Sequence, residues 1–154
     1  YIATIRLGEI TNTLDTEGIV TEKKEIPSFN DDKILKVLNT FLGETKQIPP
    51  MFSAKKIKGK KLYELARKNI EVERMPVLIN IKKISLLSFN AKKITFSVTS
   101  SKGTYIRVLG KDIAEKLGTL GYLTSLKRTK VGSFSVADST SIEEFEEKWK
   151  LSQA

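Results

Sequence analysis

The sequence of 154 residues contains no cysteine and no histidine. Their absence excludes disulfides, thiol nucleophiles and imidazole bases, and it removes the side chains that bind most structural zinc ions. No apolar run approaches the roughly 18 residues that a membrane-spanning helix needs. A cytoplasmic protein is therefore expected, and its chemistry must come from carboxylates, Lys, Arg, Tyr, Ser or Thr.

Positive charge is what the chain has in excess, with a formal net charge of +9. Residues 46–74 carry nine Lys or Arg against three Glu, and residues 102–130 carry seven against two acids, whereas both ends of the chain are acidic. Positive charge clustered between acidic segments favours a surface that faces a polyanion, most often nucleic acid. A solvated lysine-rich surface would have the same composition, so charge alone leaves both interpretations open.

Hydrophobic periodicity predicts one α+β domain with a mixed sheet. Strands are expected at residues 1–7, 19–24, 77–89 and 93–100, the first two paired across the turn NTLDTEG and the last two forming a hairpin. Helices are expected at residues 31–42, 104–117 and 142–151, the first capped by Asn30. The apolar face of the first helix is predicted to comprise Ile34, Leu35, Leu38, Phe41 and Leu42.

A lysine-rich stretch, QIPPMFSAKKIKGKKLYELARK at residues 47–68, places five lysines in a short loop after a Pro-Pro break. Such a loop repels itself unless it meets an anion. Phe52 and Tyr63 flank the lysines, and lysines on phosphates with rings beside bases are how flexible RNA segments are held. The alternative is a solvated loop in which Phe52 and Tyr63 are core anchors.

The stretch SKGTYIR, residues 101–107, lies where a strand is expected to pass into a helix. Side chains two apart on a strand point to the same face, so Tyr105 and Arg107 are predicted to project together into a cleft before the helix starts. An ordinary surface pair of these two side chains is the alternative.

Several stretches occur together in a recognisable order: YIATIRLG, TNTLDTEG, QIPPMFSAKKIKGKKLYELARKNIEV, SKGTYIR with DIAEKLG, and YLTSLKRTKVGSF. In this order and spacing the sequence closely resembles the bacterial tRNA pseudouridine synthases of the TruB family over nearly the whole chain. The resemblance implies the α+β catalytic-domain fold of those enzymes, with a mixed, mainly antiparallel sheet and flanking helices. It also implies isomerisation of a uridine in the T loop of tRNA, position 55, without a metal or an organic cofactor.

The resemblance also bears on NTLDTEG, which could hold a catalytic carboxylate or form a tight turn. The family's nucleophile is an aspartate in a G-T-L-D-P type loop, upstream of the strand that ends in Leu-Gly. Here Asp15 follows Leu7-Gly8, and Thr16 stands where that loop has proline. Asp15 thus matches a later element and is expected to form the turn or to face RNA. The nucleophile is expected outside these 154 residues, on an upstream polypeptide segment.

Individual roles follow from the same resemblance. Tyr1 matches a tyrosine that stacks on the extruded base, and Tyr105 matches a second tyrosine that contacts the base. Leu126 matches an apolar residue that packs against the base. Arg107 matches the arginine that pairs with the catalytic aspartate, a pairing that keeps a carboxylate ionised. Contacts to RNA are expected from Lys55, Lys56, Lys58, Lys60, Lys61, Arg67, Lys127 and Arg128.

The domain organisation is likewise expected from the resemblance. Residues 1–154 correspond to the C-terminal part of a catalytic domain, and residues 51–76 within it correspond to an inserted RNA-gripping segment. No stretch of the sequence resembles the family's C-terminal RNA-binding module. The expected partner is the T arm of tRNA. Two other functions stay open: a non-catalytic RNA-binding module, and an RNA-binding protein associated with the ribosome or its assembly.

Overall fold

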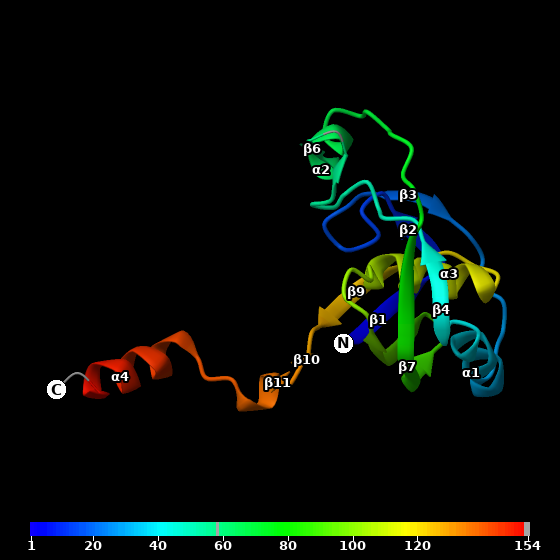
Figure 1. Ribbon diagram of the computed structural model, residues 1–154. Coiled ribbons are helices and arrows are strands. Elements are labelled where there is room, and N and C mark those ends of the chain that lie inside the picture. The colour runs from blue at the N-terminus through cyan, green and yellow to red at the C-terminus, as the bar shows by residue number, and fades with distance from the viewer. Residues whose placement is uncertain (58, 153–154) are drawn as a thin grey trace.

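The centre of the protein is a five-stranded antiparallel sheet with the strand order β4-β7-β8-β1-β9 (Figure 1). The computed structural model describes residues 1–57 and 59–152. The strands of the sheet are β1 (Ile2–Leu7), β4 (Gly43–Gln47), β7 (Val77–Asn90), β8 (Lys93–Ser100) and β9 (Gly121–Lys127). The predicted α+β class and the predicted hairpin of β7 and β8 are confirmed.

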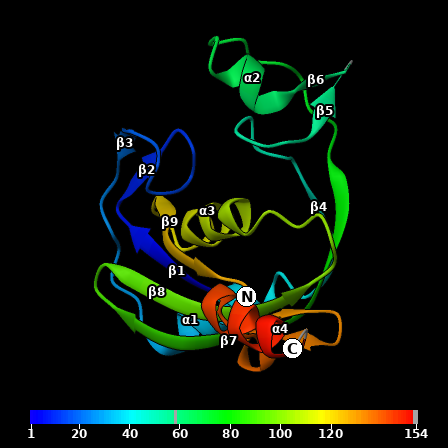
Figure 2. The ribbon, with the colours of Figure 1, turned by 90° about the vertical axis from the view of Figure 1, so that its left-hand side faces the viewer.

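Two helices, α1 (Asp31–Asn39) and α3 (Ile106–Lys116), pack on this sheet. Every second residue of β1 is buried against them, because side chains alternate along a strand. Buried side chains from the strands and from the helices form one apolar core, which includes Ala3, Ile5, Leu7, Ile34, Leu38, Ile106, Leu109 and Ile113. Helix α3 therefore packs on β1 and β9 (Figure 2).

The predicted start of the first helix is confirmed, but part of its predicted apolar face is wrong. Asn30 Oδ1 accepts a hydrogen bond from Lys33 N–H at 3.0 Å, as an N-cap residue does. Leu35 and Leu42 are 41% and 46% exposed. The helix ends at Asn39, so Leu42 lies beyond it. The buried residues of the helix are Ile34 and Leu38, and Leu35, which directly follows Ile34, lies outside this buried face.

The predicted pairing of residues 1–7 with residues 19–24 is also wrong. Strand β3 (Val20–Lys23) pairs with β2 (Glu9–Thr11), a strand that periodicity did not indicate, whereas β1 pairs with β8 and β9. The cause is Gly8, whose φ of +91° is a conformation that other residues rarely adopt, and which turns the chain after β1. The turn NTLDTEG consequently closes the small β2–β3 hairpin instead of a hairpin of the main sheet.

Residues 51–76 project from the sheet between the end of β4 and the start of β7 (Figures 1 and 2). This insertion holds β5 (Lys56–Ile57), β6 (Lys60–Lys61) and α2 (Leu62–Ala66). The expected lysine loop is thus a short antiparallel hairpin, in which Lys56 pairs with Lys61. We call residues 55–61 the lysine hairpin; its Lys58, an expected RNA contact, lies outside the described residues.

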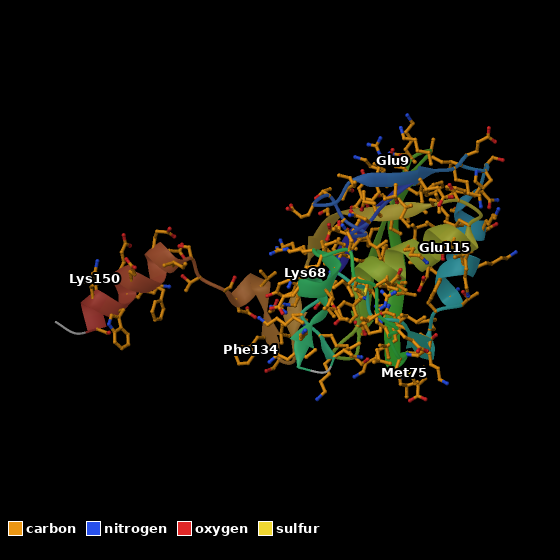
Figure 3. The ribbon with its side chains drawn as sticks, turned by 90° about the horizontal axis from the view of Figure 1, so that it is seen from above. Glu9, Lys68, Met75, Glu115, Phe134 and Lys150 are labelled. Carbon is orange, nitrogen blue, oxygen red and sulfur yellow. The ribbon has the colours of Figure 1, made fainter. Side chains whose placement is uncertain are left out.

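The C-terminal part of the chain extends away from the sheet (Figures 1 and 3). It contains β10 (Lys130–Val131), β11 (Phe134–Ser135), a short 3-10 helix at Val136–Asp138 and α4 (Ile142–Ser152). The predicted last helix is confirmed, although none of its residues is buried. In the described part of the chain, no helix combines the length and the apolar character that crossing a membrane would require.

Candidate active site

A cleft of about 260 Å³ lies between the Asn12–Gly18 turn, the start of α3 and β9. The side chains and backbone that line it belong to Asp15, Thr16, Glu17, Arg107, Leu123, Thr124, Ser125 and Leu126. Two residues that the resemblance assigned to an active site, Arg107 and Leu126, therefore lie in one cleft. Asp15, which was expected to form a turn or to face RNA, lies in it as well.

The turn is built around Asp15. Its Oδ1 accepts hydrogen bonds from Thr13 Oγ1 at 2.6 Å and from Glu17 N–H at 3.1 Å, which is the pattern of a side chain that stabilises a tight turn. Thr11 Oγ1 donates to the Asp15 carbonyl oxygen at 2.7 Å. The interpretation of NTLDTEG as a turn agrees with this geometry.

Two further features fix the turn in place. Leu14, with a φ of +64°, has a carbonyl oxygen that accepts from Leu123 N–H at 3.0 Å, which ties the turn to β9. A Cβ atom at Gly18 would collide with Thr13 Oγ1 and Asn12 Oδ1. Glycine is therefore the residue that lets Thr13 reach Asp15.

Arg107 crosses from α3 to this turn. Its Nη1 donates to Asp15 Oδ2 at 2.8 Å and to the Thr13 carbonyl oxygen at 2.7 Å, and its Nη2 donates to the Phe52 carbonyl oxygen at 2.7 Å. The two charged side chains are 22% and 26% exposed. Such a partly desolvated, charge-assisted pair holds its geometry better than an exposed one.

The prediction that Tyr105 and Arg107 share a cleft is wrong. Tyr105 is the N-cap residue of α3 and Arg107 is the second residue of the helix, so the two do not lie on a strand. Tyr105 instead lines a second cleft of about 230 Å³. That cleft is formed by Pro49, Lys55, Val77, Leu78, Ile79, Lys102, Gly103 and Tyr105.

Tyr1 is partly buried against the core at the start of β1, where its carbonyl oxygen accepts from Val98 N–H at 2.9 Å. It is not among the residues that line either cleft. Of the three residues expected to contact the base, the structure thus brings only Leu126 next to Arg107. The contacts of Tyr1 and Tyr105 with a base remain predictions.

The lysine hairpin exposes Lys56 and Lys60, while Lys61 is engaged with Tyr63. Lys61 Nζ lies 3.2 Å from Tyr63 Oη and 5.4 Å from the ring centroid, and Arg67 lies 5.4 Å from the same centroid. The hydrogen bond with the Tyr63 hydroxyl raises the pKa of Lys61. Tyr63 is therefore a half-buried ring in contact with two cations and not a core anchor.

The other expected RNA contacts lie near the clefts. Lys127 and Arg128 are exposed at the end of β9, directly after Leu126 of the first cleft. Lys55 is half-buried in the wall of the second cleft. Positive charge thus borders both clefts.

Helix α3, which carries Arg107, also carries the acid Asp112. Burial raises its pKa, and the neighbouring Lys111, 3.6 Å away, lowers it by a smaller amount. Among residues 1–57 and 59–152, no three His, Cys, Asp or Glu side chains gather where they could hold a metal ion. The lining of the first cleft includes the Asp15–Arg107 ion pair, a second acid, Glu17, and an apolar wall of Leu123 and Leu126.

Sequence reasoning missed three parts of this site: the contact between Asp15 and Arg107, the Thr13 hydroxyl, and the Phe52 carbonyl oxygen. The spacing T-x-T-x-D-x-x-G was visible and did indicate the turn. The partner of the turn was not visible, since Arg107 is 92 positions away from Asp15.

Comparison with known proteins gives the following matches. Residues 1–106 match the family described as "TruB family pseudouridylate synthase (N terminal domain)". The chain is 49% identical over 146 residues to tRNA pseudouridine synthase B of Psychrobacter cryohalolentis, covering 95% of this chain and 41% of that protein. It is 46% identical over 148 residues to the protein of the same name from Clostridium tetani, covering 96% and 51%. The chain thus spans about half or less of the length of these curated relatives.

Solved structures share the fold at lower sequence identity. A chain of a Cbf5-Nop10-Gar1 complex superposes with a TM-score of 0.64 at 22% identity, over 99% of this chain and 37% of that chain. A chain of an H/ACA RNP bound to a substrate RNA containing 2'-deoxyuridine gives a TM-score of 0.61 at 19% identity, over 99% and 35%. These two likenesses bear on the fold alone.

Proposed function

Because this chain belongs to the TruB family of pseudouridylate synthases, we propose that it forms part of an enzyme that isomerises uridine in tRNA, at position 55 of the T loop. The observation that carries the proposal is the cleft in which Arg107, Asp15 and Leu126 meet. Two relatives of nearly half identity are named tRNA pseudouridine synthase B, which supports the same substrate class.

The reaction exchanges one bond of the base for another. The bond between C1' of the ribose and N1 of uracil breaks, the base rotates, and a bond from C1' to C5 forms; the C5 proton leaves to solvent and N1 takes up a proton, so that the composition of the nucleoside is unchanged. This reaction uses a carboxylate as its nucleophile and requires no metal or organic cofactor. The base must be extruded from its stack to reach such a site.

Asp15 is the acid of the cleft that contacts Arg107, and we assign it a positioning role. Its two oxygens already accept hydrogen bonds from Thr13, Glu17 and Arg107. These hydrogen bonds take up three of the roughly four acceptor sites of the carboxylate, which suits a group that holds the guanidinium and the turn. In the proposal the attacking aspartate comes from a segment outside these 154 residues, and Arg107 is the residue that faces it.

The rest of the cleft suits a flat, partly polar ring. Leu123 and Leu126 offer an apolar wall to the face of the base, and Thr124 and Ser125 offer hydroxyls beside it. Lys127 and Arg128 continue from this wall as exposed cations, where the backbone of an RNA loop would pass. Tyr1 and Tyr105 are proposed base contacts on the strength of the resemblance.

The insertion is proposed to grip the T arm. The lysine hairpin lies on an insertion that projects from the sheet (Figure 2). Arg67 adds one more cation, against the same Tyr63 ring that Lys61 of the hairpin contacts. Positively charged groups on a projecting hairpin can follow a phosphate backbone without reading sequence. The T arm is thus the proposed partner of residues 51–76.

The experiment compares the 154-residue chain with a protein that also carries the upstream segment. Both are mixed with a T-arm stem-loop whose uridines are tritiated at C5. We expect both to bind the RNA, the chain alone more weakly, and only the longer protein to release tritium. Turnover by the chain alone would show that its own carboxylates suffice. Binding without turnover by the longer protein would leave a non-catalytic RNA-binding module.

A further inference from the structure

Gln47 joins the sheet to the helix that carries Arg107. It is the last residue of β4, and its side chain is buried, at 4% exposure. Its Nε2 donates to the Tyr105 carbonyl oxygen at 3.1 Å, and its Oε1 accepts from Tyr105 N–H at 2.8 Å. Only one orientation of the amide satisfies both contacts, so Gln47 pairs with Tyr105 as a backbone unit of a neighbouring strand would.

The residue that Gln47 holds is the one that starts α3. Tyr105 is the N-cap residue, with an extended backbone, and its own side chain makes no capping hydrogen bond. Its carbonyl oxygen also accepts the first helical bond, from Leu109 N–H at 3.1 Å. Because Arg107 follows two residues later, the direction in which its side chain leaves the helix depends on where Tyr105 is fixed.

A second contact joins the same two segments. Five residues after Gln47, the carbonyl oxygen of Phe52 accepts from Arg107 Nη2 at 2.7 Å. Pro49 and Pro50 lie between them, both buried, and their rings restrict the backbone. Residues 47–52 thus form a stiff bracket with one end on the helix start and the other on the guanidinium.

The bracket is also the root of the insertion. Gln47 pairs with Val77 in the sheet, so the chain leaves for the insertion and returns from it at the same place. Arg74 Nη1, on the returning side, lies 3.3 Å from the Pro49 carbonyl oxygen. A displacement of the insertion by bound RNA would therefore reach Arg107 through the bracket.

We propose that Gln47 is a positioning residue of the reaction: it holds the start of α3 so that Arg107 faces the cleft, and it fixes the root of the RNA-gripping insertion to the same point. It touches neither the uridine nor the nucleophile. This inference rests on the proposed function. It adds a buried, uncharged residue to the machinery, which neither the charge pattern nor the cleft lining indicates.

The test replaces Gln47 in the full-length enzyme by Met, which has a similar length and makes neither hydrogen bond. The single-turnover rate of tritium release at saturating RNA should fall by on the order of 10- to 100-fold, because misplacement of a catalytic group by about 1 Å costs that much. The dissociation constant for RNA should stay within about threefold. The matched control is Thr119→Val, which alters a buried polar side chain at the other end of α3 and should keep the wild-type rate.

A second readout separates positioning from general destabilisation. The ¹⁵N resonance of Arg107 Nε–H, assigned by its loss in Arg107→Lys, should shift or broaden in Gln47→Met and stay unchanged in Thr119→Val. Gln47→Glu has the native shape and covers the case in which Gln47→Met does not fold. Its protonated carboxyl can make both hydrogen bonds with Tyr105, whereas its carboxylate can accept from Tyr105 N–H but cannot donate to the carbonyl oxygen, so its rate relative to wild type should fall as pH rises through the range in which the carboxyl ionises. The proposal would be overturned if folded Gln47→Met reacted at the wild-type rate. It would also be overturned if Gln47→Met reacted slowly while its Arg107 resonance stayed unchanged. A wild-type enzyme that makes no pseudouridine would instead refute the proposed function.

Discussion

Replacement of Asp15 by asparagine is the substitution that tests the assignment of this residue most directly. The new side chain would keep an oxygen for Thr13 Oγ1 and Glu17 N–H, so the turn should survive, but its amide group would face Arg107 in place of the carboxylate oxygen 2.8 Å away. A hydrogen bond between charged groups contributes about 1.5–3 kcal/mol. Since the two side chains are 22% and 26% exposed, we take the lower part of that range, about 1.5–2 kcal/mol.

Each 1.36 kcal/mol lost from the transition state is a tenfold loss of rate, so Asp15→Asn should slow the reaction by about 10- to 30-fold and leave measurable turnover. The assay is single-turnover release of tritium from C5-labelled uridine by the full-length enzyme at saturating RNA. Asp138→Asn, an exposed site in the C-terminal extension with the same change of charge, is the control and should react at the wild-type rate. Loss of all turnover in Asp15→Asn would mean that Asp15 is itself the nucleophile, and an unchanged rate would mean that its contact with Arg107 does nothing for catalysis.

Three further predictions concern RNA binding, the turn and stability. Changing the four described lysines of the lysine hairpin to Ala should reduce the slope of log affinity against log salt by about 0.7–0.9 for each of these lysines that binds a phosphate; an unchanged slope in a salt titration would remove the hairpin from the RNA interface. Gly18→Ala should push Thr13 away from Asp15 and lower the single-turnover rate, with RNA affinity retained; a wild-type rate would show that this contact is dispensable. Asp112→Asn should raise the midpoint of thermal unfolding near pH 7, because burial raises the pKa of Asp112 and its ionisation therefore costs stability as pH rises through the carboxyl range. The difference from wild type should vanish at pH values where Asp112 is protonated in both states, and a difference that grows toward low pH would contradict this sign.

Local sequence patterns correctly predicted those helices and hairpins that are specified by residues close together in the sequence. Asn30 before Asp31 and Asp32 indicated a helix start, and the alternation on either side of Asn90-Ala91 indicated a hairpin, because capping and strand pairing across a short turn depend on neighbours in sequence. The two edge strands of the sheet, β4 and β9, were missed. In β4 three of the five residues are exposed, and in β9 three buried residues are followed by one half-buried and three exposed ones, so neither strand carries a period of two.

The site divides in the same way. The sequence by itself determined that Asp15 lies in a glycine-closed turn and that lysines gather in residues 55–61. Through the motifs that resemble the TruB family it also predicted active-site roles for Arg107 and Leu126, and the structure places both residues in one cleft. Only the tertiary structure decided that Arg107 contacts Asp15, that Tyr105 lines a different cleft, and that Gln47 and Phe52 brace the start of α3. These contacts join residues between 55 and 92 positions apart. Their geometry is fixed by packing of α3 on β1 and β9, which no pattern within one stretch of sequence specifies.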